Sequence, residues 1–160
     1  MKPTFIALLA LCLCLPLVGA DKDTPLPKDI PSLKVLAEKG DARAQNELGL
    51  KYHIGQGVKK NPKEAVKWIR KAAEQGYANA QYNLGSIYSQ GDGVESDSVR
   101  SYKWFFLAER SGHDKAKEAR RKMIEARGMT IVQMSEGRKQ AKEFKPRVKT
   151  KAKEEKQVLW

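Results

Sequence analysis

The fold is decided by residues 41–76, which read DARAQNELGLKYHIGQGVKKNPKEAVKWIRKAAEQG. The following residues, 77–112, read YANAQYNLGSIYSQGDGVESDSVRSYKWFFLAERSG and align with the first stretch without a gap. The shift is 36 residues, and 13 positions are identical. The identical pairs are Ala42/Ala78, Ala44/Ala80, Gln45/Gln81, Leu48/Leu84, Gly49/Gly85, Tyr52/Tyr88, Gly55/Gly91, Gly57/Gly93, Val58/Val94, Lys67/Lys103, Trp68/Trp104, Ala72/Ala108 and Gly76/Gly112. A fixed period of this length predicts a repeat architecture.

The first half of each unit has helical spacing. Ala44, Leu48 and Tyr52 follow one another at i, i+4 and i+8, which places them on one face of a helix and not on a strand. Gly49 flanks the same face, although a glycine inside a helix costs about 1 kcal/mol relative to alanine. Its recurrence as Gly85 indicates that a second helix packs closely at this point.

A turn and a second helix complete each unit. Gly55 ends the first helix of the first unit, Asn61 caps the second helix, and Glu64 is expected to complete a capping box. The apolar stripe of the second helix runs over residues 65–73. The second unit has the same plan, with Ser96 or Asp97 as the cap.

Partial units flank the two full repeats. Residues 32–40 match the end of a second helix, and residues 116–127 match a further first helix. Thr130 and Gln133 form a capping box for a last helix that is expected to run to Phe144.

These patterns predict one all-α domain over residues 32–144. It should hold about six helices, stacked as two full repeats plus end caps. Ser101 and Glu109 stand where the first unit has small alanines, so the local packing of the second unit is expected to differ there.

The pattern resembles the Sel1-like repeat family. The resemblance implies a right-handed α-solenoid, related to tetratricopeptide arrays, that serves as a protein-binding scaffold. The residues that carry it are Ala42, Arg43, Ala44, Gln45, Leu48, Gly49, Tyr52, Gly55, Gln56, Gly57, Val58, Ala65, Trp68 and residues 71–76, together with the recurrence at residues 78–94. Residues 127–130 with Gln133 are similar to a C-terminal cap found after such repeats.

The first 20 residues predict an export signal. Lys2 is followed by an apolar run over residues 5–15, which is too short to span a bilayer, since that needs about 20 residues. Small residues around Ala20 then favour cleavage before Asp21. An uncleaved N-terminal anchor is the alternative. The mature chain would begin with a linker over residues 21–31, would have no transmembrane segment, and would be periplasmic or secreted.

The cysteine count excludes several classes of protein. The chain has 160 residues and 2 Cys, and both cysteines lie in the expected signal segment. A leucine precedes each of them, which argues against a lipoprotein. The mature chain would hold no disulfide and no cysteine-based zinc site. With 41% hydrophobic and 31% charged residues, the composition is that of a structured, soluble chain.

Positive charge is concentrated in the C-terminal part. The net charge is +12, of which residues 113–160 contribute +8. Residues 145–160 are expected to form a basic, disordered tail. Its candidate contacts with an anionic partner are Lys145, Arg147, Lys149, Lys151 and Lys153. Nucleic acid is not an expected partner, because aromatic residues that would stack on bases are missing from residues 145–159.

The residues do not form a recognisable catalytic or metal-binding motif. The two histidines, His53 and His113, are too far apart in sequence for the helical zinc motif. Gly55 and Gly57 lack the strand and the Lys-Ser/Thr of a phosphate-binding loop. Some cysteine-rich relatives in the resembled family have been linked to β-lactam hydrolysis, but their repeats are stapled by disulfides. The chain is therefore not expected to be an enzyme or to hold a cofactor or metal.

The concave face is the predicted binding surface. In solenoids of this type the first helix of each pair lines the concave side, and residues between the packing positions face outward. Leu50 and Tyr82 are the strongest candidates, because an exposed apolar or tyrosine side chain often anchors an interface. Contact with neighbouring repeats is the alternative role for both. The predicted partner-binding residues are Arg43, Asn46, Leu50, His53, Asn79, Tyr82, Ser86 and Lys122.

The leading functional hypothesis is a non-catalytic, exported scaffold that binds another protein. Envelope assembly, host interaction and toxin immunity are the processes that the resemblance implies. The second hypothesis is an envelope-associated protein that binds anionic lipid or polysaccharide through the basic C-terminal region. A β-lactam or cell-wall hydrolase is the remote third.

Overall fold

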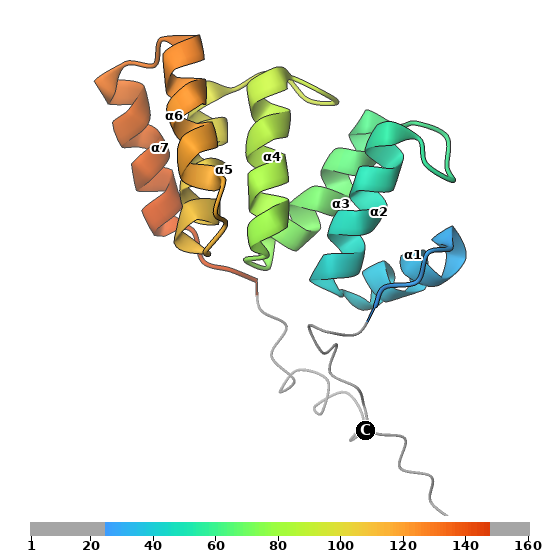
Figure 1. Ribbon diagram of the computed structural model, residues 1–160. Helices are drawn as coiled ribbons and strands as arrows, with labels where there is room; N and C mark the ends of the chain where they lie inside the picture. The colour runs from blue at the N-terminus through green and yellow to red at the C-terminus, as the bar shows by residue number, and fades with distance from the viewer. Residues whose placement is uncertain (1–24, 148–160) are drawn as a thin grey trace, which may run out of the picture.

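The computed structural model describes residues 25–147, and this part of the chain is all-α. The helices lie side by side in an array that runs from α1 at one end to α7 at the other (Figure 1). They are α1 (Ile30–Lys39), α2 (Ala42–Ile54), α3 (Pro62–Glu74), α4 (Ala78–Gln90), α5 (Ser98–Arg110), α6 (Ala116–Arg127) and α7 (Ile131–Glu143). The described residues thus form seven helices where about six were expected, and α1 covers most of the stretch of residues 32–40 that matched the end of a second helix. None of the helices in this range is long and apolar enough to cross a membrane.

The turns within the repeats follow the sequence signals. Gly55 and Gly91 end α2 and α4 in the left-handed conformation, with φ of 80° and 79°, a region that glycine enters without strain. The side chains of Asn61 and Asp97 cap α3 and α5. The capping box expected around Glu64 is only half present, because the Glu64 carboxylate pairs with a lysine one turn along the same helix.

One glycine in each repeat, Gly49 in the first and Gly85 in the second, lets the two helices of that repeat come into close contact. Their recurrence in the sequence predicted this. A Cβ atom on Gly49 would lie 2.5 Å from Cγ1 of Ile69 and 3.0 Å from the carbonyl oxygen of Ala65. A Cβ atom on Gly85 would lie 2.8 Å from the ring of Phe105. The second helix of each repeat therefore packs directly against the backbone of the first, and the missing side chain is what makes the distance possible.

Buried glutamines join each repeat to the helix before it. The Gln45 amide donates to the carbonyl oxygen of Ala37 at 2.9 Å, and its own oxygen accepts from Gln75 at 2.7 Å. The same arrangement recurs 36 residues later: Gln81 donates to the carbonyl oxygen of Ala73 and accepts from Ser111 at 2.9 Å. Each glutamine therefore hydrogen-bonds to the C-terminal ends of two helices, α1 and α3 for Gln45 and α3 and α5 for Gln81. These bonds fix how the repeats stack.

The second repeat accommodates its two departures from the small alanines of the first. Ser101 is fully buried and donates its hydroxyl to the carbonyl oxygen of Gly85 at 2.8 Å. Glu109 accepts two hydrogen bonds from the guanidinium of Arg120, at 2.8 and 3.2 Å. The packing does differ at these places, as expected, and both polar groups are paired.

The C-terminal cap does not repeat the plan of the other pairs. The capping box of Thr130 and Gln133 is present, as predicted, and α7 ends at Glu143, one residue before the expected Phe144. The helix packs against α5, where Gly137 lies so close that a Cβ atom would approach the ring of Tyr102 to 2.8 Å. After α7 the backbone N–H of Arg147 donates to the carbonyl oxygen of Glu74 at 2.7 Å. The chain therefore returns to the end of α3 after the last helix.

Candidate functional site

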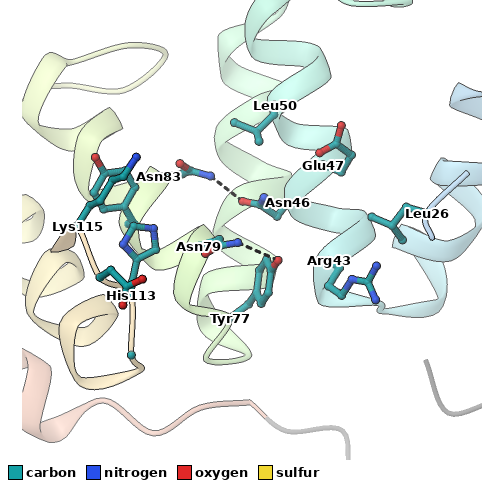
Figure 2. A pocket seen from close by; sticks show the side chains of 13 residues that line it. Leu26, Arg43, Asn46, Glu47, Leu50, Tyr77, Asn79, Asn83, His113 and Lys115 are labelled. Carbon is teal, nitrogen blue, oxygen red and sulfur yellow. Dashed lines mark hydrogen bonds between the residues drawn. The ribbon is translucent and has the colours of Figure 1, made fainter. Parts of the chain in front are cut away.

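A groove of about 680 Å³ runs across both repeats on the side formed by α2 and α4. Figure 2 shows side chains of α2, α4 and the turn before α6 pointing into it. We call it the inner groove. Its lining residues are Leu26, Arg43, Asn46, Glu47, Leu50, Tyr77, Asn79, Tyr82, Asn83, Gly112, His113, Asp114 and Lys115.

Amide groups form the centre of the inner groove. Asn83 of α4 donates to the side-chain oxygen of Asn46 of α2 at 2.9 Å, which links the two repeats (Figure 2). Asn79 is exposed and donates to the hydroxyl of Tyr77 at 3.1 Å. Because an amide group carries both donors and acceptors, this lining can satisfy the N–H and C=O groups of a polypeptide segment laid along it.

Stacked rings form the wall of the groove near α6. The Tyr82 and His113 rings lie 4.2 Å apart with an interplanar angle of 9°, and Tyr82 also contacts Phe105 at 5.6 Å between ring centroids. Nδ1 of His113 is buried and has no hydrogen-bond partner among the described residues. The stack offers a flat apolar surface beside the amides, the kind of feature that often anchors a bound chain.

Five of the predicted partner-binding residues lie together in the inner groove: Arg43, Asn46, Leu50, Asn79 and Tyr82. Their orientation differs from the prediction at three places. Asn46 is buried, with 7% of its surface exposed, because its side chain is held by Asn83. Leu50 and Tyr82 are half-buried and pack against core clusters as well as facing the groove. Both therefore have the contacts with neighbouring repeats that were the alternative role.

The remaining predicted residues of this surface lie elsewhere. His53 and Ser86 line a smaller hollow of about 110 Å³ next to Leu50. Nε2 of His53 lies 2.7 Å from the Asp92 carboxylate, so the pair connects the end of α2 with the turn after α4. Lys122 lies on an exposed part of α6, 3.7 Å from Glu118, and lines neither hollow.

Several residues of the inner groove were not predicted from the sequence. Tyr77 and His113 were not selected, because they lie in the turns before α4 and α6 and not on a helix face. A signal was available, since the 36-residue shift places them at equivalent positions. Asn83 was missed because its partner is 37 residues away in the chain, and spacing within one helix does not indicate it.

Only part of the predicted basic tail lies in the described range. Arg147 forms an ion pair with Glu74 at 3.2 Å, and Pro146 lies beside Gly76. Lys145 is exposed. Lys149, Lys151 and Lys153 lie outside the described residues, as do residues 1–20 of the predicted signal.

Over residues 25–147, no three His, Cys, Asp or Glu side chains come together in a group that could hold a metal ion. The inner groove offers amides, hydroxyls, stacked rings and a few charges of both signs. These groups suit recognition by hydrogen bonds and apolar contact.

Comparisons with known proteins agree with the repeat pattern. The family model of the Sel1 repeat matches residues 42–77 and 78–113. None of the curated proteins matches the chain. The solved structures that are similar to it include two proteins of which the chain spans about a quarter to a third of the length.

The first is a protective antigen present in uropathogenic Escherichia coli strains, which displays an SLR fold. It is 35% identical over 71% of this chain and 24% of that chain, with a TM-score of 0.67. The second is a Sel1 repeat protein from Oxalobacter formigenes, which is 40% identical over 54% of this chain and 35% of that chain, with a TM-score of 0.52. Through the two repeats of residues 42–113, the chain belongs to the Sel1 repeat family.

Proposed function

We propose that this Sel1 repeat protein is a non-catalytic, exported scaffold that binds a segment of another protein in the inner groove. The observation that carries the proposal is the groove itself, which both repeats build and which their amides and stacked rings line. A groove of about 680 Å³ accepts several residues of a partner.

The groove suits a polypeptide better than a small charged ligand. Helix α4 has no charged residue, and α2 has two of each sign when its cap Asp41 is included. A ligand with strong charge would find little complementary potential here. The main chain of a partner would find donors and acceptors in the amides, and an apolar side chain would find Leu50 and the Tyr82 ring.

Site-specific crosslinking tests this location. A photoreactive residue at Asn79 is exposed and faces the groove, and one at Ser135 is exposed on α7. We expect Asn79 to crosslink one defined protein in the producing cells and Ser135 to crosslink none of it. Equal crosslinking of that protein from both positions would remove the assignment to the inner groove.

The proposal of export makes a separate prediction. If residues 1–20 are removed by a signal peptidase, the protein recovered from the periplasm or the medium begins at Asp21. N-terminal sequencing of that material measures this directly. Protein that keeps Met1 in the envelope fraction would favour the uncleaved anchor.

A further inference from the structure

Helix α3 carries a row of cations on the side that faces away from the core. Its buried side is made of Ala65, Val66, Ile69, Ala72 and Ala73. Lys63, Lys67 and Lys71 follow one another at i, i+4 and i+8 and are all exposed. This row spans about 12 Å along the helix, at 1.5 Å per residue. Lys59 and Lys60 are also exposed and precede the helix.

The carboxylates near this row are fewer than its cations. Residues 59–74 contain six Lys or Arg and two Glu. The Glu64 carboxylate pairs with Lys67, and Glu74 is bound by Arg147 at 3.2 Å. The excess of positive charge therefore stays at the surface of this helix.

Several cations of α5 and α6 are held by other groups of the fold. On α6, Arg121 bridges Glu118 and Glu125, and Arg120 pairs with Glu109. On α5, the ammonium group of Lys103 lies over the Trp104 ring at 5.0 Å, and burial lowers the pKa of Lys103 although nearby Glu74 opposes this. These cations are engaged within the fold.

A shallow apolar hollow adjoins the row of lysines. It measures about 480 Å³ and lies between α3 and the turn at Gly93 and Val94. Trp68 lines it together with Val66, and the ammonium group of Lys71 lies 4.1 Å from the centre of the Trp68 ring. A half-buried tryptophan surrounded by lysines is typical of residues at the boundary between water and lipid.

The basic surface continues from α3 to α5. The guanidinium of Arg70 donates to the Tyr88 hydroxyl at 2.7 Å, and the guanidinium of Arg100 lies 5.7 Å from the centre of the same ring. Arg100 is exposed and Arg70 half-buried. Cations of two neighbouring repeats therefore meet at Tyr88.

We propose that this surface, the α3 face, docks on a phospholipid bilayer that carries anionic headgroups. Its cations are spread along an exposed helix and do not converge on one point, so they match a charged plane better than a single anion. Long lysine side chains can reach such a plane while Trp68 and Val94 approach the headgroup region. Each cation near an anionic bilayer strengthens binding about fivefold. The inner groove, lined by α2 and α4, would stay open to a protein partner.

Vesicle binding tests the proposal with variants of equal charge change. K63E/K71E alters the α3 face, K117E/K122E alters exposed positions of α6, and K149E/K151E alters the basic tail. The full-length protein and the three variants are sedimented with vesicles of phosphatidylcholine containing 30% phosphatidylglycerol, and with phosphatidylcholine alone. Circular dichroism checks that helicity is equal in all four.

We expect the unaltered protein to bind the anionic vesicles at low salt and to be released as salt shortens the screening length. K63E/K71E should weaken that binding roughly thirtyfold or more, while the α6 and tail variants should stay within about fivefold of the unaltered protein. Equal binding to neutral and anionic vesicles would overturn the proposal. So would an equal loss in all three variants, or binding of polyglutamate by the α3 face without binding of anionic vesicles.

Discussion

The two repeats have the same backbone plan but different neighbours. The first repeat packs its inner helix through Leu48 against α1, in a small cluster with Leu33, Ala37 and Ala44. The second packs Leu84 into the largest cluster, which extends from α3 through α5 to Ala141 of α7. Equivalent residues thus have unequal numbers of neighbouring elements, which indicates that stability rises toward the middle of the array, as expected when each repeat contacts only its neighbours.

Charge substitutions of the two equivalent leucines should have the largest effect. Leu48 and Leu84 are both fully buried, and Leu→Asp would place an unpaired carboxylate between packed helices. We expect each variant to lose several kcal/mol, against a total stability of about 5–15 kcal/mol. Leu84→Asp should lose more helicity, because the cluster around that residue draws on more helices. Circular dichroism and thermal unfolding measure this, and unchanged helicity and Tm in either variant would show that its leucine is not core.

Removal of a glutamine that joins the repeats should have an intermediate effect. Gln81→Ala removes the hydrogen bonds to the carbonyl oxygen of Ala73 and to Ser111. Gln45→Ala removes the equivalent bonds to Ala37 and Gln75. We expect each to lower the free energy of unfolding by about 1–3 kcal/mol.

Urea unfolding of both glutamine variants would measure the two losses side by side. Similar values would show that the two bridges are equivalent. A variant as stable as the unaltered protein would show that its bridge contributes nothing.

Ser101→Ala should have the smallest effect, since it gives the second repeat the alanine that the first has at position 65. The variant loses one hydrogen bond, from the Ser101 hydroxyl to the carbonyl oxygen of Gly85, and opens little space. We expect a loss of about 0.5–1.5 kcal/mol in urea unfolding. A gain in stability would mean that burial of the hydroxyl costs more than its hydrogen bond contributes.

The repeated part of the fold could be predicted because its signals are local and occur twice. Glycine turns, the Asn61 cap and the i, i+4 spacing of α2 each act within a few residues, and the 36-residue shift checks one unit against the other. The packing of the last helix could not be predicted equally well. It has no second copy in the chain, and the close approach of Gly137 to Tyr102 depends on residues far apart in the sequence.

The residues of the candidate site could likewise be predicted only where their position depends on a single helix. Helix periodicity found Arg43, Leu50, Asn79 and Tyr82 as residues off the packing face, and all four line the groove. It gave Asn46 the same role, although this side chain is buried. The cause is its hydrogen bond to Asn83 in the next repeat, and spacing within one helix carries no information about a bond between helices.

The most direct test of the proposed function compares two variants of equal charge. The measured quantity is the affinity of each variant for the partner identified by crosslinking. Asn79→Arg fills the inner groove from an exposed position, and Ser135→Arg adds the same side chain to the exposed part of α7. Leu50 and Tyr82 are less suitable as test sites, because both side chains also pack against the core. In a titration of the purified partner, we expect Asn79→Arg to raise Kd at least about tenfold, a loss of roughly 1.4 kcal/mol, and Ser135→Arg to leave it within about twofold. An unchanged Kd for Asn79→Arg, with unfolding curves equal for both variants, would contradict binding in the inner groove.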